Sequence, residues 1–291
     1  MKRIFLILGC LFFLFPFALS YLNDGFSLHK IQSEYADAPQ WEIRNPPQEE
    51  VAALLDQHFY YIGKGSQCYV FESEDKQFIL KFFRQDRYRL PKVTKLFTCP
   101  TFLNDIQQKK REIKERKRDA LFQSCKIAYE ELKEETGLIY LHLNKSDDLP
   151  KVVVLHDKLK RAHSIKIGDY AFILQKHGEH IFPYLTRLIK KGKKREAKEA
   201  LDSLVVLLVS RLQKGIVDHD AVIHKNSGFK NNQALFLDIG EFEKQLCSNP
   251  YKEIVSETHD LHLWLRRKDQ ELATYLEGAI EKSQTFDKHC K

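Results

Sequence analysis

Short apolar runs separated by polar turns characterise the first half of the chain. The turns at 63–66 and 72–76 separate β-prone runs of four to six residues, and such runs predict strands joined by tight hairpins. The runs lie at 59–62, 67–71, 78–83, 152–155 and 170–174. We therefore expect a small antiparallel sheet, with its first three strands consecutive in the sequence.

Helical periodicity is found in other parts of the chain. The segments that carry it are 47–57, 107–135, 182–191, 196–214 and 251–282. The pattern of 196–214 ends at Gly215, a common residue after a helix. Its apolar face consists of Leu201, Leu204, Val205, Leu208 and Leu212. A sheet followed mainly by helices predicts an α+β fold.

The N-terminus has the pattern of a targeting segment. Lys2 and Arg3 precede an apolar run over residues 4–18, and Ala18-Leu19-Ser20 provides a small-x-small cleavage site. We interpret residues 1–20 as a signal peptide, or as a signal anchor if the segment stays uncleaved. The bulk of the chain is then exported or membrane-anchored, outside the cytoplasm, because the two cations stay inside. A buried core helix is the weaker alternative, since Pro16 would break it.

Composition narrows the class of protein further. The 291 residues are 43% hydrophobic and 30% charged, which excludes a disordered chain. The net charge of +7 suits a phosphate-bearing ligand or an anionic membrane, and gives no specific nucleic-acid signal. The five cysteines beyond the leader are scattered without a CxxC spacing, so neither a disulfide framework nor a zinc site is expected.

Two basic runs require an interpretation. The run 109–118 alternates with acidic residues and is typical of a solvated helix face. The denser run 190–195 is consistent with contact to anionic lipid or nucleic acid, or with a solvated loop. We favour the loop, because no aromatic residues are interleaved to stack on bases.

Two features of the predicted sheet are candidates for ligand binding. Gly63 and Gly65 lie between two strands, where glycines allow the backbone to approach a phosphate closely or simply form a hairpin turn. Lys81 lies within an apolar strand. Such a lysine either faces solvent at an edge or is a buried cation that needs an anionic partner.

The second half of the chain contributes oxygen donors in loops. Asp218, Asp220 and Asn226 follow the helix that ends at Gly215, and Asp238 follows an apolar strand. Such residues are usually caps and turns. Carboxylates and an amide are also suitable ligands for Mg²⁺.

The order of these pieces resembles the protein-kinase-like superfamily. The segment Gly63-Lys-Gly65-Ser-Gln-Cys68-Tyr-Val70 is similar to its glycine-rich loop, with Cys68 at the third glycine. Lys81 stands where the family has its strand lysine. The segment from Gly215 to Asp220 resembles the catalytic loop, and Leu237-Asp238-Ile239-Gly240 resembles the Asp-Phe-Gly motif. The resemblance covers residues 60–245 and is that of a divergent member.

The resemblance implies a role for each matched residue. Gly63, Gly65, Val70 and Lys81 would contact the nucleotide. Asp220 would accept the proton of the acceptor hydroxyl. Asp238 and Asn226 would bind Mg²⁺. Glu135 would pair with Lys81, and Glu131 is the alternative.

Several positions depart from the family pattern. Asp218-His219 replaces the usual His-Arg, and Val222 stands in the position of a lysine. Lys225 occupies the position of the metal-binding asparagine, so Asn226 needs a one-residue bulge to reach it. No Ala-Pro-Glu motif follows, and about fifty residues remain, which predicts a short C-terminal part. These departures favour either a trimmed kinase or an inactive relative.

The resemblance implies a bilobal fold with a small antiparallel-sheet N-lobe and a short helical C-lobe. Residues 21–58 would form an extension, residues 59–177 the N-lobe and residues 178–291 the C-lobe. The implied function is transfer of the ATP γ-phosphate to the hydroxyl of a small molecule, a sugar-lipid or a protein, with ATP and Mg²⁺ as cofactors. The alternative is a catalytically inactive binding or scaffold protein, exported or anchored by the N-terminal segment.

Overall fold

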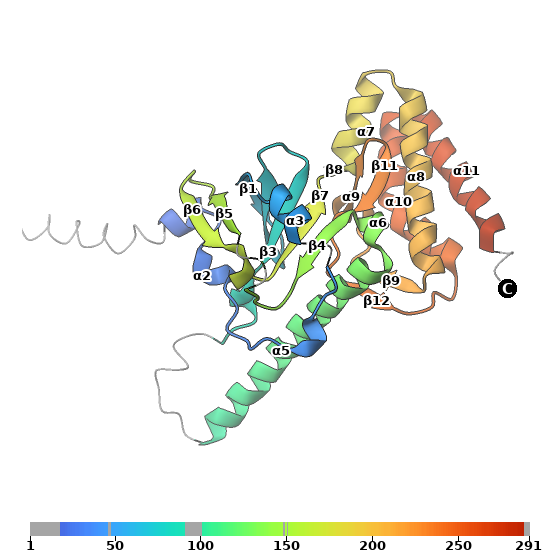
Figure 1. Cartoon of the computed structure of the whole chain (residues 1–291). Helices are drawn as coiled ribbons and strands as arrows, with labels where there is room; N and C mark the ends of the chain where they lie inside the picture. Colours follow the sequence, from blue (N-terminus) through green and yellow to red (C-terminus); the bar gives the residue numbers. More distant parts are fainter. Residues whose placement is uncertain (1–17, 46–47, 91–100, 148, 150, 288–291) are drawn as a thin grey trace, which may run out of the picture. The chain divides into compact units, whose positions relative to one another are not determined.

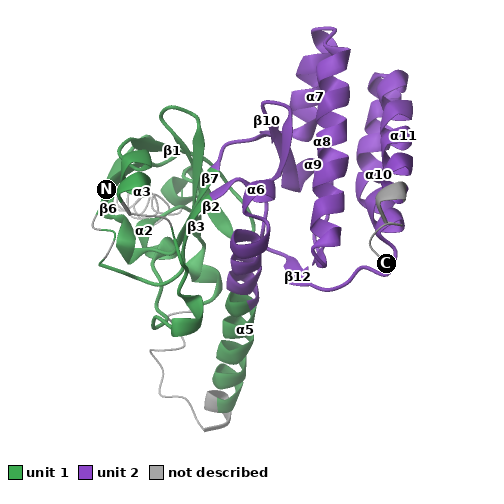
Figure 2. Cartoon of the chain, turned by 45° about the vertical axis from the view of Figure 1, so that its right-hand side comes forward, with its two compact units in different colours: residues 1–119, 139–175 green, residues 120–138, 176–291 purple. Residues whose placement is uncertain are grey.

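The computed structural model describes residues 18–45, 48–90, 101–147, 149 and 151–287 (Figure 1). The chain divides into two compact units, coloured green and purple in Figure 2. Unit 1 comprises residues 1–119 and 139–175, and unit 2 comprises residues 120–138 and 176–291. The predicted leader falls almost entirely on residues 1–17, which lie outside the described residues. Among the helices of the described residues, none is long and apolar enough to cross a membrane.

Unit 1 is built on a seven-stranded sheet with the order β4-β7-β3-β2-β1-β5-β6. Its strands are β1 (His58–Lys64), β2 (Cys68–Ser73), β3 (Phe78–Phe83), β4 (Leu138–His142), β5 (Val152–His156), β6 (Ala162–Lys166) and β7 (Phe172–Lys176). The pairs β1–β2, β2–β3 and β5–β6 are antiparallel, whereas β5 runs parallel to β1. The predicted antiparallel hairpins are confirmed.

Short helices accompany the sheet of unit 1. They are α2 (Leu28–Ile31), α3 (Gln48–Leu54) and the 3₁₀ turns η1 (Pro39–Trp41), η2 (Gln85–Arg87) and η3 (Ile167–Asp169). Phe26, Ile31, Val51 and Leu55 are buried in the same core as the sheet. Each contributes about 1.5–3 kcal/mol by leaving water. The predicted extension 21–58 therefore contributes these four residues to the core of unit 1.

The face of the sheet opposite this core carries two of the predicted binding residues. Phe71, Leu80 and Phe82 belong to the core, and side chains alternate between the two faces along a strand. Val70 and Lys81 lie directly opposite each other on β2 and β3, and both are half-buried. They therefore share the other face of the sheet.

A buried carboxylate fixes the turn between β5 and β6. Asp157 accepts backbone N–H bonds from Leu159 and Arg161 at 2.9 and 3.0 Å, and side-chain bonds from Arg161 and His163 at 2.8 and 3.0 Å. The amide of Asn23 donates a further bond at 3.2 Å. Burial alone would raise the pKa of the Asp157 carboxyl, but the hydrogen bonds from His163 and Arg161 and the charge of Arg161 lower it to about 2.

Unit 2 is mainly helical. Its helices are α6 (Lys133–Thr136), α7 (Ile181–Lys190), α8 (Lys194–Gln213), α9 (Ile223–Asn226), α10 (Pro250–Lys268) and α11 (Gln270–Asp287), and α5 (Thr101–Glu131) contributes residues to both units. Its short strands are β8 (Glu179–His180), β9 (Ile216–Asp218), β10 (Ser227–Lys230), β11 (Gln233–Phe236) and β12 (Phe242–Lys244). The sheets are β11-β10-β8 and β12-β9.

Two predicted helices are broken in the structure. The segment 251–282 divides at Asp269, whose backbone is extended and whose carboxylate accepts the N–H of Glu271 at 3.1 Å. This contact caps the first turn of α11. The segment 107–135 divides at Leu132, so Glu135 lies in the separate turn α6, which ends at Gly137 with a φ of 62°. The α+β class is confirmed.

Candidate functional site

The glycine turn of unit 1 has an open surface. Neither Gly63 nor Gly65 has a positive φ. A Cβ added at Gly63 would meet nothing within 4 Å, and the nearest atom at Gly65 would be the carbonyl oxygen of Cys68 at 4.0 Å. The fold of unit 1 therefore does not require glycine at either position. Bare backbone in an exposed hairpin is suited to the close approach of a ligand.

Hydrogen bonds hold this turn in place. The N–H of Gly65 donates to the carbonyl of Cys68 at 2.9 Å and closes the hairpin. The ammonium of Lys64 donates to the carbonyl of Asp24 at 2.6 Å, and the guanidinium of Arg84 donates to the carbonyl of Gly65 at 3.2 Å. The turn is thus anchored to the segment before α2 and to the end of β3.

In unit 2, a loop after β9 carries the predicted catalytic aspartate. The backbone N–H of Asp220 donates to the Asp218 carboxylate at 3.0 Å. The side-chain amide of Asn226 donates to the carbonyl of Asp220 at 2.5 Å. The N–H groups of Leu237 and Asp238 both donate to the carbonyl of Asn226, at 2.7 and 3.0 Å. Asn226 therefore connects Asp220 to Asp238 within one hydrogen-bond network.

The helical turn α9 accommodates the extra residue before Asn226. The N–H groups of Lys225 and Asn226 both donate to the carbonyl of Val222, at 2.9 and 3.0 Å. Lys225 is exposed, whereas Asn226 is half-buried and bonded to the Asp220 backbone. A helical turn thus stands where a one-residue bulge was expected, and its last residue, Asn226, is bonded to the aspartate loop.

A serine of α5 supports the Asp238 turn. The Ser124 hydroxyl donates to the carbonyl of Ile239 at 2.6 Å and accepts the N–H of Phe242 at 2.7 Å. The Asp238 carboxylate accepts the N–H of Gly240 at 3.2 Å. Ser124 was not predicted as a site residue. The only signal in the sequence is a serine on an otherwise apolar helix face beside Leu121 and Cys125.

Carboxylates gather around this loop. Burial raises the pKa of Glu241, and the negative charges of Asp220 and Asp238 raise it further. The pKa of Asp218 is also raised, mainly by burial and in part by the same two carboxylates, while Arg211 acts in the opposite direction. Glu241 is a further residue that the sequence pattern did not indicate. The accumulated negative charge favours a bound cation.

The donors at this loop fit Mg²⁺ only in part. Among the described residues, no group of three or more His, Cys, Asp or Glu side chains is arranged to hold a metal ion. Asp238 and Asn226 offer hard oxygen donors. A Mg²⁺ ion held by one or two protein ligands keeps several waters and takes phosphate oxygens of its substrate. The two residues therefore fit a metal that arrives with a nucleotide.

The two candidate partners of Lys81 both interact with lysines of unit 2. Glu135 accepts the Ser210 hydroxyl at 2.6 Å and forms an ion pair with Lys214. Burial alone would raise the pKa of Glu135, but the hydrogen bonds from Lys214 and Ser210 lower it. Glu131 pairs with Lys244 at 2.6 Å. The pairing of Glu135 with Lys81 stays a prediction.

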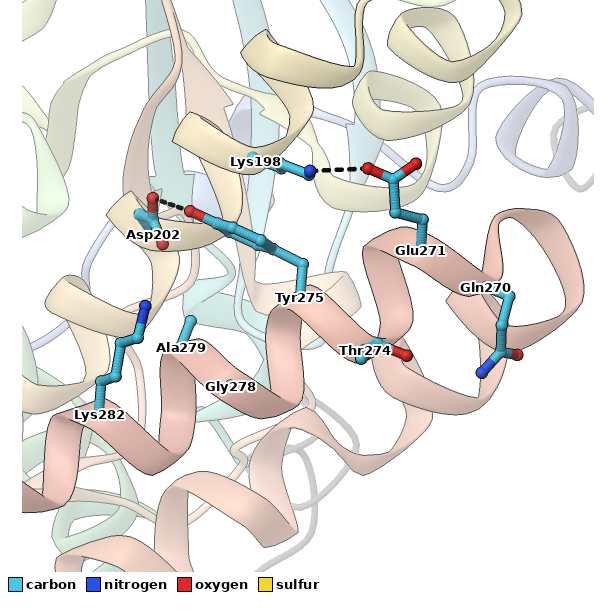
Figure 3. Close-up of a pocket in the computed structure, with 9 residues that line it drawn as sticks. All are labelled: Lys198, Asp202, Gln270, Glu271, Thr274, Tyr275, Gly278, Ala279 and Lys282. Atoms are coloured by element: carbon cyan, nitrogen blue, oxygen red, sulfur yellow. Dashed lines mark hydrogen bonds and ion pairs between the residues drawn. The ribbon is translucent and has the colours of Figure 1, made fainter.

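A separate pocket lies between α8 and α11, with a volume of about 530 Å³ (Figure 3). Lys198 pairs with Glu271 at 2.7 Å, and the Tyr275 hydroxyl donates to Asp202 at 2.6 Å; Figure 3 marks both interactions with dashed lines. None of the predicted site residues lines this pocket.

Acidic side chains neutralise much of the basic run 190–195. Lys193 pairs with Glu196 at 2.7 Å, and Lys194 pairs with Glu271 at 2.6 Å. Arg195 pairs with Glu199 at 3.2 Å. Such pairing reduces the charge that this run presents to an anionic surface.

Comparisons with known proteins find only a distant structural similarity to solved structures. No protein-family model matches the sequence, and no curated protein matches it. The chain is similar to WbdD. A 2.2 Å crystal structure of WbdD has a TM-score of 0.40 and 14% identity, over 79% of this chain and 46% of that one.

A second structure, described as the bifunctional kinase-methyltransferase WbdD, has a TM-score of 0.35 and 15% identity, over 75% of this chain and 43% of that one. The chain thus spans less than half the length of the WbdD chains. At these TM-scores the likeness supports no conclusion about function.

Proposed function

We propose that this protein is an ATP- and Mg²⁺-dependent phosphotransferase of the protein-kinase-like type, acting on a hydroxyl acceptor. The observation that carries the proposal is the network in which Asn226 joins the Asp220 loop to Asp238. The resemblance assigns a proton acceptor and a metal ligand to these two aspartates. The network supports the proposal because it bonds the displaced asparagine to the backbone of both segments.

The proposal assigns nucleotide binding to residues of unit 1 and metal binding to residues of unit 2. Gly63, Gly65, Val70 and Lys81 contact the nucleotide, with Lys81 on its phosphates. Asp238 and Asn226 would hold Mg²⁺, and the ion would supply positive charge to neutralise the phosphates. Most of the rate enhancement in such enzymes comes from positioning and charge stabilisation.

The transfer step balances with these groups alone. The acceptor hydroxyl oxygen forms a bond to the γ-phosphorus, and the bond between that phosphorus and the bridging oxygen of ADP breaks. The hydroxyl proton passes to the Asp220 carboxylate, which is exposed at the surface of unit 2. ADP leaves with the electron pair of the broken bond.

An inactive binding protein is the second candidate. Cys68 replaces the third glycine, and the N–H of Gly65 is already bonded to the carbonyl of Cys68. One donor of the turn is therefore unavailable to a phosphate. The predicted export signal also favours this candidate, because ATP is scarce outside the cytoplasm. This candidate binds nucleotide, or a partner, without turnover.

Nucleotide binding can be tested by thermal shift of the full chain with millimolar ATP and Mg²⁺. A ligand that binds only the folded state raises the melting temperature by mass action. We expect a shift for the wild type and for the control Asp147→Asn, an exposed aspartate paired with Lys166. Asp238→Asn should lose the Mg²⁺-dependent part of the shift. No shift in the wild type would reject the phosphotransferase.

A further inference from the structure

A buried ion cluster lies within unit 2. The guanidinium of Arg211, on α8, forms an ion pair with Glu257 of α10. Its Nη1 lies 3.9 Å from Oδ2 of Asp218. The side chains of Arg211, Glu257 and Asp218 are 0%, 2% and 7% exposed. The Cζ of Arg211 also lies 5.4 Å from the centroid of the Phe236 ring.

Stability does not explain this cluster. Two carboxylates share one guanidinium, and the removal of charges from water is costly even when they are paired. Within the described part of the chain, Nε and Nη1 of Arg211 and Oε2 of Glu257 have no hydrogen-bond partner. Apolar side chains of similar volume often stabilise such a site as well or better. The burial of these three charged groups is therefore weak evidence for a stabilising role.

Asp218 connects the cluster to the proposed catalytic loop. Its Oδ2 faces Arg211, and its Oδ1 accepts the backbone N–H of Asp220 at 3.0 Å. The carboxylates of Asp220 and Asp238 oppose the charge on Asp218, while Arg211 favours it. Removal of Arg211 would therefore take away a cation that favours the charge of the carboxylate that fixes the Asp220 backbone.

We propose that Arg211 is a positioning residue for Asp220, acting through the Asp218 carboxylate that holds the Asp220 backbone. Its effect on turnover rests on the proposed phosphotransfer. Its effect on the loop does not, because the hydrogen bond from Asp220 to Asp218 exists in the protein without substrate. The two effects can therefore be measured separately.

The test compares three changes in the full chain. R211M/E257L removes the buried ion pair and leaves apolar side chains in its place. Asp218→Asn keeps the shape of the side chain and removes its charge. R195M/E199L is the matched control, since it removes an exposed arginine–glutamate pair from the same helix.

The first measurement is amide hydrogen exchange of peptides that cover residues 216–224. We expect exchange to accelerate about tenfold in R211M/E257L and in Asp218→Asn, because local opening becomes easier. The control should match the wild type. Unchanged exchange in both variants, at a melting temperature near that of the wild type, would overturn the proposal.

The second measurement is ADP release from ATP and Mg²⁺, with water as the acceptor. A supporting residue behind a site typically contributes about 10- to 100-fold to activity. We expect kcat to fall by that factor in R211M/E257L at an unchanged KM for ATP and a near-native melting temperature. Full turnover in that variant would show a purely structural role. No ADP release from the wild type would reject phosphotransfer, and the exchange measurement would then decide on Arg211.

Discussion

The side-chain amide of Asn226 donates a hydrogen bond to the backbone carbonyl of Asp220 at 2.5 Å. The carbonyl of Asn226 in turn accepts the N–H of Asp238 at 3.0 Å. One residue thus fixes the distance between the two aspartates to which we assign proton transfer and metal binding. The network is formed even though Asn226 is one position later than the family pattern requires.

Replacement of Asn226 by alanine should therefore lower activity more than replacement of its neighbour Lys225. Asn226→Ala removes a donor to Asp220 and a proposed metal ligand, so we expect ADP release to fall by about 10- to 100-fold. Lys225→Ala alters an exposed side chain and should change ADP release by less than about twofold. Equal losses of ADP release in the two variants would contradict the role that we assign to Asn226.

The glycine turn allows binding to be separated from stability. Gly63→Ala and Gly65→Ala meet no close atom and require no left-handed backbone, so the melting temperature should stay within about 2 °C of the wild type. The ATP-induced thermal shift should decrease, because the added methyl group obstructs a phosphate. A retained shift would mean that the turn is only a hairpin.

Gly168 is the matched control for these glycine variants. A Cβ at Gly168 would lie 2.3 Å from the carbonyl oxygen of Ser146. Gly168→Ala should therefore destabilise the protein by about 1–3 kcal/mol, measured by urea unfolding. If Gly168→Ala were as stable as Gly63→Ala, our description of the space for a Cβ at these two positions would be wrong.

Asp157 should contribute to stability in a pH-dependent manner. Its pKa is about 2 in the folded protein, below the ordinary value near 3.8. Its contribution is therefore fully present above pH 4 and is lost as the pH falls towards 2. The shift corresponds to about 2 kcal/mol. Urea unfolding of Asp157→Asn should show this loss at pH 7 and a smaller difference from the wild type near pH 2.

Glu257 should have the opposite pH dependence. Burial raises its pKa to about 7, although Arg211 acts against the shift. The folded state then binds more protons than the unfolded state between pH 4.5 and 7, so this group lowers stability as the pH rises through that window. Glu257→Gln should flatten the dependence of the unfolding midpoint on pH in that range. An unchanged slope would contradict the raised pKa.

The sequence predicted the local hairpins well because turn residues separate the runs. It missed β4, Leu138–His142, which is largely buried and lacks the alternation of a half-buried strand. It also missed β6, Ala162–Lys166, where Ile165 is the only buried residue. It joined α10 to α11, because the capping role of Asp269 depends on backbone geometry that the hydrophobic pattern does not record.

The sequence also indicated some residues of the proposed site and missed others. Motif order indicated Asp220, Asn226 and Asp238, since these residues are close in sequence to recognisable turns. Ser124 was not indicated, because its partner Ile239 lies 115 positions away in the sequence. Arg211 was not indicated either, although its partner Asp218 is only seven positions away. Arg211 follows Leu204 and Leu208 on the apolar side of α8. A cation on such a face is a weak signal that becomes informative once its buried partners are known.

The most direct test of the central claim is Mg²⁺-dependent ADP release by the full chain, compared with Asp220→Asn, Asp238→Asn and the control Asp147→Asn. The account predicts turnover by the wild type and the control that requires Mg²⁺, and a loss of at least about 100-fold in the two site variants. Turnover that persists in both site variants, or that is absent from the wild type while ATP still raises its melting temperature, would contradict catalysis at this loop.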